Sequence, residues 1–237
     1  MPDPLNLAGL PQGFTGVRLL GRSPLSEVFL VADDRGRLLA LKVLRESAAR
    51  DPRIRERWRR EAALLEEIHH PHLIRSHGEL EIEGRPALLL EYIDGPSLRE
   101  RLQGGPLRWE EAARIGIQVA QALGRLHRPG ALHRDVKPHN VRLDPGRGAV
   151  LAALGLVRRR EDPTLTAQGT ALGSPAYMSP EQARDPTSVG PEADVYSLGA
   201  TLHHALSGRP PFLGRGVGEV IHRVMHTDPE PLPEGIP

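Results

Sequence analysis

The sequence contains no cysteine, and lysine occurs only twice among its 31 basic residues. The missing cysteine excludes disulfide bonds and metal sites built on thiolates. The chain also has no apolar run close to the ~18 residues at which a membrane-spanning helix is expected. Its first residues, Met1-Pro2-Asp3-Pro4, lack the basic-then-apolar pattern of a secretory signal. These absences lead us to expect a cytoplasmic protein without a membrane segment.

The composition that is present fits a globular protein. Of 237 residues, 39% are hydrophobic and 26% are charged, which is enough for one large domain or two smaller lobes with their own cores. The formal net charge of +1 gives no support for a nucleic acid as partner.

Strand patterns dominate the first part of the chain and helical patterns the rest. Apolar runs separated by turn signals predict strands at residues 28–31, 38–44, 73–80 and 87–93. Helices are predicted at residues 52–67, 109–127, 192–207 and 218–226. In the second of these helices, Ala112, Ile115, Val119, Ala122 and Leu126 form an apolar stripe.

Strands followed by helices indicate an α+β fold with two lobes. We expect an N-terminal lead at residues 1–13, a small lobe at residues 14–93 and a large lobe at residues 94–237. The small lobe should hold an antiparallel sheet and one helix, and the large lobe should be mainly helical.

Several motifs with conserved spacing in one family occur here in the right order. They are His133-Arg134-Asp135-Val136-Lys137-Pro138-His139-Asn140, Gly21-Arg22-Ser23-Pro24-Leu25-Ser26-Glu27-Val28, Ala40-Leu41-Lys42, Glu61, Gly173-Ser174-Pro175-Ala176-Tyr177-Met178-Ser179-Pro180-Glu181 and Asp194-Val195-Tyr196-Ser197-Leu198-Gly199. From Phe14 onward the chain resembles a protein kinase domain, most closely a bacterial Ser/Thr kinase of the eukaryotic-like class. The resemblance implies the bilobal kinase fold, with ATP and Mg²⁺ as cofactors.

The resemblance also implies catalytic roles for single residues. Lys42 would contact the α and β phosphates of ATP and be held by Glu61. Asp135 would orient the attacking hydroxyl, Lys137 would lie near the γ phosphate, and Asn140 would bind the metal. The two lysines of the chain are Lys42 and Lys137. Their positions reflect either chance in an arginine-rich chain or a need for a compact ammonium that a planar guanidinium does not replace, and we favour the second interpretation.

Further residues receive binding or regulatory roles from the same resemblance. Around the nucleotide we expect Gly21, Val28 and Ala40, with the backbone of Glu91 and Ile93 bonding adenine. Arg134 would pair with a phosphate on the activation segment. The candidate positions in that segment are Thr164, Thr166 and Ser174.

The chain departs from the family where the metal is bound. Ala153-Leu154-Gly155 stands where kinases carry Asp-Phe-Gly, so the carboxylate that grips magnesium is replaced by a methyl group. Asp144, Glu161 and Asp162 lie at turn or loop positions and are not expected to replace it.

The nucleotide site departs from the family at two further places. Ser23 and Ser26 replace glycines of the phosphate loop, and Pro24 at its tip has no N–H to offer a phosphate. Arg142 replaces the apolar residue under adenine. It either stacks on the base or pairs with Asp94 and fills the pocket, and we favour the second arrangement because a buried guanidinium needs partners.

Three hypotheses follow for the function. We favour a catalytically impaired pseudokinase that acts as a regulatory or scaffolding module. The alternatives are an active or weakly active Ser/Thr kinase with atypical metal binding, and a nucleotide-binding switch without phosphoryl transfer. The family's last helices are expected to be missing, through truncation or through reduction of the large lobe. A reduced lobe would expose apolar surface and favour a protein partner or a homodimer.

Overall fold

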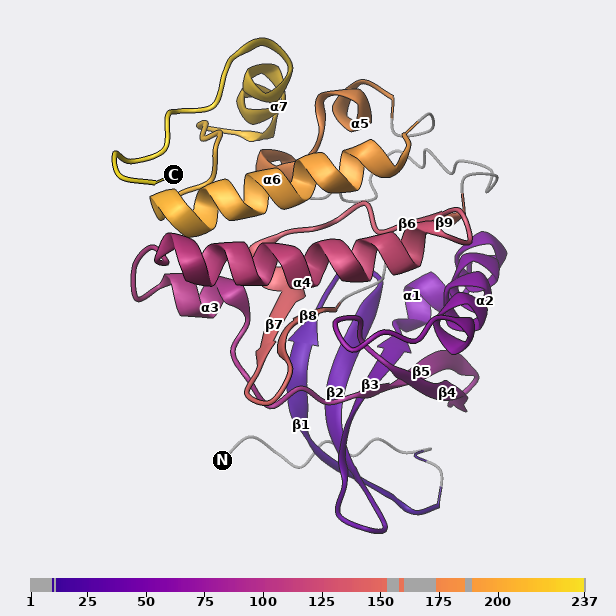
Figure 1. Ribbon diagram of the computed structural model, residues 1–237. Coiled ribbons are helices and arrows are strands. Elements are labelled where there is room, and N and C mark those ends of the chain that lie inside the picture. The colour runs from indigo at the N-terminus through magenta and orange to yellow at the C-terminus, as the bar shows by residue number, and fades with distance from the viewer. Residues whose placement is uncertain (1–9, 11, 153–157, 160–173, 186–188, 237) are drawn as a thin grey trace. The chain divides into compact units, whose positions relative to one another are not determined.

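The computed structural model describes residues 10, 12–152, 158–159, 174–185 and 189–236 (Figure 1). The chain divides into two compact units. Unit 1 comprises Met1–His69 and Ile74–Tyr92, and unit 2 comprises His70–Leu73 and Ile93–Pro237. The lobe boundary predicted from the sequence stays a prediction.

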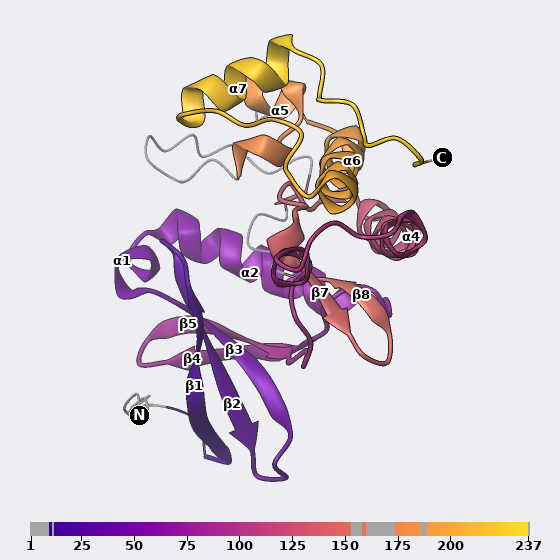
Figure 2. The same cartoon turned by 90° about the vertical axis from the view of Figure 1, so that its left-hand side faces the viewer.

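Unit 1 is built on a five-stranded antiparallel sheet with strand order β1-β2-β3-β5-β4 (Figure 2). Its strands are β1 (Phe14–Arg22), β2 (Ser26–Asp33), β3 (Leu38–Leu44), β4 (Ser76–Ile82) and β5 (Arg85–Glu91). The prediction of strand 38–44 is confirmed. The strand predicted at 73–80 corresponds to β4, and the strand predicted at 87–93 corresponds to β5. The first prediction was placed too early and the second too late, because β4 and β5 pair across the turn at Glu83-Gly84, and this pairing determines where both strands begin and end.

Alternation along the strands of unit 1 sends one set of side chains into its core. The core consists of Phe29, Val31, Leu39, Leu41, Val43, Ile82, Ala87 and Leu89. Two helices, α1 (Glu46–Ala49) and α2 (Pro52–Glu67), follow β3, and α2 packs against β4 and β5. Helix α2 begins where it was predicted, because Asp51 caps it by accepting from the Arg53 N–H at 2.9 Å.

Unit 2 is mainly helical. Its helices are α3 (Leu98–Leu102), α4 (Trp109–His127), α5 (Pro180–Arg184), α6 (Pro191–Ser207) and α7 (Val217–His226), with short 3₁₀ turns η1 (Pro138–Asn140) and η2 (Pro175–Tyr177). The two long helices, α4 and α6, lie side by side (Figures 1 and 2). The predicted stripe of α4 is buried as expected.

Two small strand pairs complete unit 2. Strand β6 (Ala131–Leu132) pairs with β9 (Arg158–Arg159), and β7 (Val141–Asp144) pairs with β8 (Gly148–Leu151). The turn between β7 and β8 is closed by Asp144, whose carboxylate accepts from the N–H groups of Gly146 at 2.9 Å and Arg147 at 2.8 Å.

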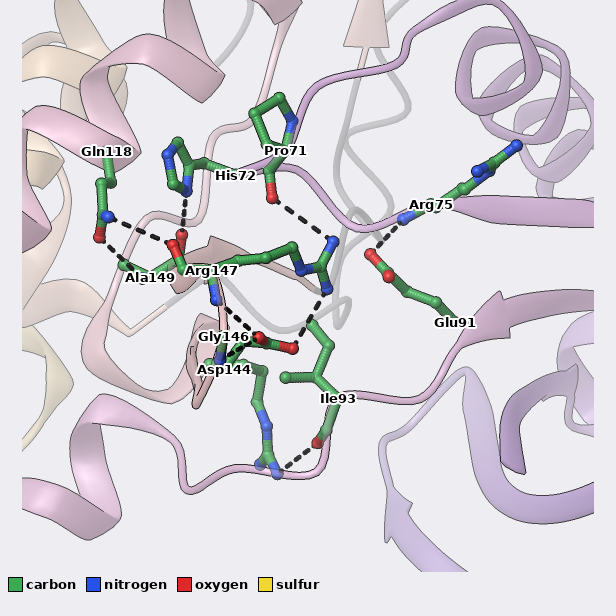
Figure 3. Close-up of polar contacts among 11 residues, drawn as sticks. Pro71, His72, Arg75, Glu91, Ile93, Gln118, Asp144, Gly146, Arg147 and Ala149 are labelled. Atoms are coloured by element: carbon green, nitrogen blue, oxygen red, sulfur yellow. Dashed lines mark hydrogen bonds and ion pairs between the residues drawn. The ribbon is translucent and has the colours of Figure 1, made fainter. Parts of the chain in front are cut away.

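Strand β8 is held along its outer edge by two residues from other parts of the chain (Figure 3). Gln118 of α4 accepts from the Ala149 N–H at 2.8 Å. Next to it, His72 Nδ1 donates to the Ala149 carbonyl at 2.9 Å, and the Leu151 N–H donates to the His72 carbonyl at 2.9 Å. The short segment His70–Leu73 therefore belongs to unit 2 although unit 1 lies on both sides of it in the sequence.

An antiparallel sheet in unit 1 and helices in unit 2 confirm the α+β prediction. None of the helices in the described ranges combines the length and the apolar composition that crossing a membrane requires.

The close approach at Gly95 gives a test of the fold. A β-carbon there would lie 1.8 Å from the carbonyl oxygen of Leu143, so one of the two backbones would have to move. We expect Gly95→Ala to lower the free energy of unfolding by about 2 kcal/mol or more in urea titrations.

Gly124 provides the matched control. It is exposed inside α4 and has open space around its α-carbon, so Gly124→Ala should raise the free energy of unfolding by about 0.5–1 kcal/mol. Equal effects of the two substitutions would contradict the close approach at Gly95.

Candidate functional site

The sheet of unit 1 brings four predicted nucleotide-site residues onto neighbouring strands. In the strand registers, Gly21 of β1 is opposite Val28 of β2, and Val28 is opposite Lys42 of β3. Ala40 lies two positions before Lys42 and therefore on the same face of the sheet. The sheet thus aligns the glycine-loop and lysine motifs across three strands.

Lys42 is buried in an ion pair with Glu61. Lys42 Nζ lies 3.0 Å from Glu61 Oε1, and only 11% and 4% of the two side chains are exposed. The pairing predicted from the sequence within unit 1 is present. Because a buried charge without a partner is strongly destabilising, each side chain makes the burial of the other tolerable.

Trp58 also contacts the ammonium and was missed in the sequence analysis. Lys42 Nζ lies 4.9 Å from the centroid of the Trp58 ring, a cation–π distance. Trp58 is buried on α2 one turn before Glu61, so both side chains approach Lys42 from the same helix face. The i, i+3 spacing of a tryptophan and the expected glutamate was the signal available in the sequence.

The turn between β1 and β2 is closed by its own serine. Ser23 Oγ accepts from the N–H groups of Leu25 at 3.3 Å and Ser26 at 2.9 Å, and the Ser23 N–H donates to the Ser26 carbonyl at 2.8 Å. Pro24, between them, has no N–H. The backbone donors from residues 23 to 26 are therefore all used within the turn.

The residues predicted to form a catalytic loop come together in unit 2. Lys137 Nζ lies 2.8 Å from Asp135 Oδ2, and Asn140 Nδ2 donates to the same oxygen at 2.8 Å and to the Asp135 carbonyl at 2.7 Å. Asn140 is buried, and its amide oxygen is the atom that could face a metal. The described residues contain no group of three histidine or carboxylate side chains arranged to hold a metal ion.

Asp194, in the first turn of α6, fixes the backbone just before Asp135. Its carboxylate accepts from the backbone N–H groups of His133 at 2.8 Å and Arg134 at 2.7 Å, and from His127 Nε2 at 2.8 Å. Arg134 has a φ of 64°, a left-handed conformation that is costly for arginine. Burial alone would raise the pKa of Asp194, but these hydrogen bonds and the nearby His133 ring lower it below its ordinary value.

Arg142 of β7 has partners within unit 2. Its guanidinium donates to the Gly95 carbonyl and, at 3.5 Å, to the carbonyl of Ile93, and it lies 3.7 Å from Glu100. Glu100 is thus a carboxylate partner that the sequence analysis missed, and the predicted pairing with Asp94 stays a prediction. In the same unit, Asp144, which was not expected to replace the missing metal carboxylate, is engaged in closing the β7–β8 turn.

Of the remaining predicted site residues, the structure describes some and leaves others outside the described ranges. Glu91 lies at the end of β5 in unit 1, where its carboxylate accepts from the Arg75 N–H at 2.9 Å (Figure 3). Ser174 precedes η2 and lines a cavity of about 10 Å³ together with Asp135. Ala153, Thr164 and Thr166 lie outside the described residues.

Comparison with known families assigns residues 14–230 to the protein kinase domain. The chain belongs to the protein kinase family. The Ser/Thr kinase PknB of Mycobacterium leprae is 38% identical over 220 residues, covering 90% of this chain and 35% of the relative. PkaA of Streptomyces coelicolor is 38% identical over 229 residues, covering 93% of this chain and 41% of the relative.

These findings support a bacterial Ser/Thr kinase domain with the phosphotransferase fold. The Mycobacterium tuberculosis PknB is similar to the same extent, at 37% identity over 221 residues. The chain spans about 35% of the length of the PknB relatives it matches. The roles of the individual kinase residues stay predictions.

The Asp194 contacts predict a pH-dependent contribution to stability. Asp194→Asn should lower the free energy of unfolding at neutral pH by about 3 kcal/mol, because it removes a buried charge that several donors face. The folded-state pKa is lowered, so this contribution is complete above the ordinary aspartate value of 3.8 and is lost as the pH falls below it. Urea titrations of both proteins across this range measure the difference.

Asp228→Asn is the control, because Asp228 is exposed. It should change the free energy of unfolding by less than about 0.5 kcal/mol. A difference between Asp194→Asn and the unsubstituted protein that grows on acidification would contradict the assignment.

The Lys42–Trp58 contact predicts an energetic coupling. Trp58→Leu should cost about 1 kcal/mol more in the unsubstituted background than in a Lys42→Met background, because only the first contains the cation. A double-mutant cycle by urea unfolding measures this difference. Trp58→Phe, which keeps an aromatic face, should lose less of the coupling, and a coupling of zero would show that the ring acts only by packing.

Proposed function

We propose that this kinase domain is catalytically impaired and acts as a regulatory or scaffolding module, through a protein partner or a second copy of itself. The observation that carries the proposal is Ala153, at the position where the family places its magnesium-binding aspartate. An alanine methyl group cannot coordinate a hard divalent cation, which prefers carboxylate oxygens. Losing about 4 kcal/mol of charge stabilisation would slow phosphoryl transfer roughly a thousandfold.

The β1–β2 turn supports the proposal independently of the metal. Phosphates are held in glycine-rich loops by backbone N–H groups that point at the ligand. In this chain Ser23 and Ser26 already take up those donors, and Pro24 has none. A nucleotide phosphate would have to displace these internal hydrogen bonds, so the described residues fit ATP with magnesium poorly.

Arg142 supports the proposal at the position expected beneath adenine. Its guanidinium is bonded to the carbonyls of Ile93 and Gly95, and Ile93 belongs to the segment expected to bond the base. With Glu100 nearby, the charge is satisfied within unit 2. This favours the interpretation that Arg142 fills base-binding space over the one in which it stacks on a bound base.

A weakly active kinase is the second candidate, and the geometry of the retained residues favours it. Lys42 and Glu61 are paired in unit 1, and Asp135, Lys137 and Asn140 are assembled in unit 2. These residues would position the phosphates of ATP and the attacking hydroxyl if ligands other than the missing aspartate bound the metal. ATP and Mg²⁺ are the cofactors of this second candidate.

Ligand binding distinguishes the candidates. Binding to the folded state raises the melting temperature by mass action, so we expect ATP with Mg²⁺ or Mn²⁺ to leave the melting temperature of the chain unchanged at millimolar concentration. Ala153→Asp should introduce a metal-dependent rise. Trp58 fluorescence in a Trp109→Phe background offers a second readout, because these are the two tryptophans of the chain and Trp58 contacts Lys42.

Asp135→Asn in the Ala153→Asp background is the control for phosphoryl transfer, because it keeps the metal carboxylate and removes the expected base. A metal-dependent rise for the unsubstituted chain, with phosphate incorporated at Thr164 or Thr166, would establish the weakly active kinase instead. A rise that ATP causes without any metal would identify a nucleotide-binding switch.

A further inference from the structure

Helix α7 carries two histidines on its solvent side, His222 and His226. The core side of the helix is defined by Val220 and Val224, which are buried in a cluster with Phe212. Side chains two positions further along a helix point to the opposite side, and both histidines are exposed. Among the described residues, neither imidazole takes part in a hydrogen bond or an ion pair. Their ring nitrogens are therefore available to a ligand from solution.

The four-residue separation places the two rings next to each other on the surface of α7. Their centroids lie 4.8 Å apart, and their planes are inclined by 48°. A metal ion with bonds of 2.0–2.1 Å to two imidazoles needs the two ligating nitrogens about 3 Å apart. Because these nitrogens lie at the edges of the rings, small rotations of the side chains bring one nitrogen of each ring to that separation. His222 and His226 are the only two of the 11 histidines in the sequence that are four positions apart.

The charges around the pair do not oppose the binding of a cation. Arg223, the neighbour of His222, forms an ion pair of 2.7 Å with Glu219. His226 is the last residue of α7, where the final carbonyls give the helix a partial negative charge. Glu219 also accepts from the Arg215 N–H at 2.8 Å, so this carboxylate is already engaged. The chain thus offers two ligands here, in agreement with the absence of a three-residue metal group from the described ranges.

We propose that His222 and His226 chelate a divalent first-row transition-metal ion, with water completing its coordination. Imidazole nitrogen suits Cu²⁺, Ni²⁺ and Zn²⁺, whereas Mg²⁺ prefers oxygen ligands. Two histidines four residues apart on one face of a helix are also the arrangement found in helical zinc sites. An ion bound in this way would cross-link the last turn of α7, which packs against α5 and η2. None of the residues predicted to bind ATP or magnesium takes part, so the inference is independent of the function proposed above.

Isothermal titration calorimetry tests the site on the 237-residue chain, prepared without a histidine tag and without nucleotide. We expect one Ni²⁺ ion to bind per chain, more tightly than Zn²⁺, and Mg²⁺ alone to give no binding. His222→Gln and His226→Gln should each weaken Ni²⁺ binding at least about tenfold, because the second imidazole acts at a high effective concentration. His77→Gln should leave the affinity unchanged, since His77 is exposed and is the only histidine of β4.

Melting temperatures measured without metal establish that each variant is folded before its affinity is compared. Ni²⁺ should raise the melting temperature of the unsubstituted chain by mass action and leave that of the double variant His222→Gln/His226→Gln unchanged. Equal Ni²⁺ affinity in the unsubstituted chain and in His226→Gln would overturn the proposal. A loss of affinity in His77→Gln as large as that in His222→Gln would also overturn it.

Discussion

The segment predicted to be the catalytic loop of this domain depends on one buried carboxylate. Asp194 receives hydrogen bonds from two consecutive backbone N–H groups, at His133 and Arg134, and from the side chain of His127 at the end of α4. These bonds hold Arg134 in a left-handed conformation that it would not adopt alone, and the next residue is Asp135. Because Asp194 lies in the first turn of α6, its negative charge also interacts favourably with the positive end of the helix dipole.

Retained and altered features of the domain differ in the type of interaction they involve. The retained features are pairs of opposite charge, Lys42 with Glu61 and Lys137 with Asp135, and each pair is satisfied within the chain. The altered features are places where a nucleotide would need donors or space, and there Ser23 and Arg142 bond to the chain itself. Removing one member of a buried charge pair destabilises the fold, whereas open donors serve only a ligand. A domain that no longer transfers phosphoryl groups would keep its charge pairs and lose its open hydrogen-bond donors.

Local signals in the sequence were sufficient for the longer helices α2, α4, α6 and α7, whereas the short helices α1, α3 and α5 were not predicted. Tertiary contacts decided most of the rest. Asp51 and Pro52 mark the start of α2, and the apolar stripe of α4 marks that helix over its whole length. The strand predicted from Leu73 failed because Leu73 pairs with Leu151 in unit 2, far away in sequence. Ordered motifs were sufficient to predict the Lys42–Glu61 contact, whereas the contact between Asp135 and Asn140 was not predicted. The contact of Trp58 with Lys42 was missed although its i, i+3 spacing from Glu61 indicated it. The positions of Glu100 beside Arg142 and of the closed Ser23 turn depend on distances that no spacing rule supplies.

The segment His70–Leu73 makes the two units interdependent as folding entities. Neither unit is a continuous stretch of chain, because this segment interrupts unit 1 and supplies unit 2 with the partner of Leu151. A fragment that starts at Ile93 would lack the contacts of His72 and leave Ala149 without one of its hydrogen bonds. A fragment that ends at Tyr92 would carry those four residues with nothing to bind them. The domain should therefore melt in one cooperative transition and resist division by proteolysis into two stable halves.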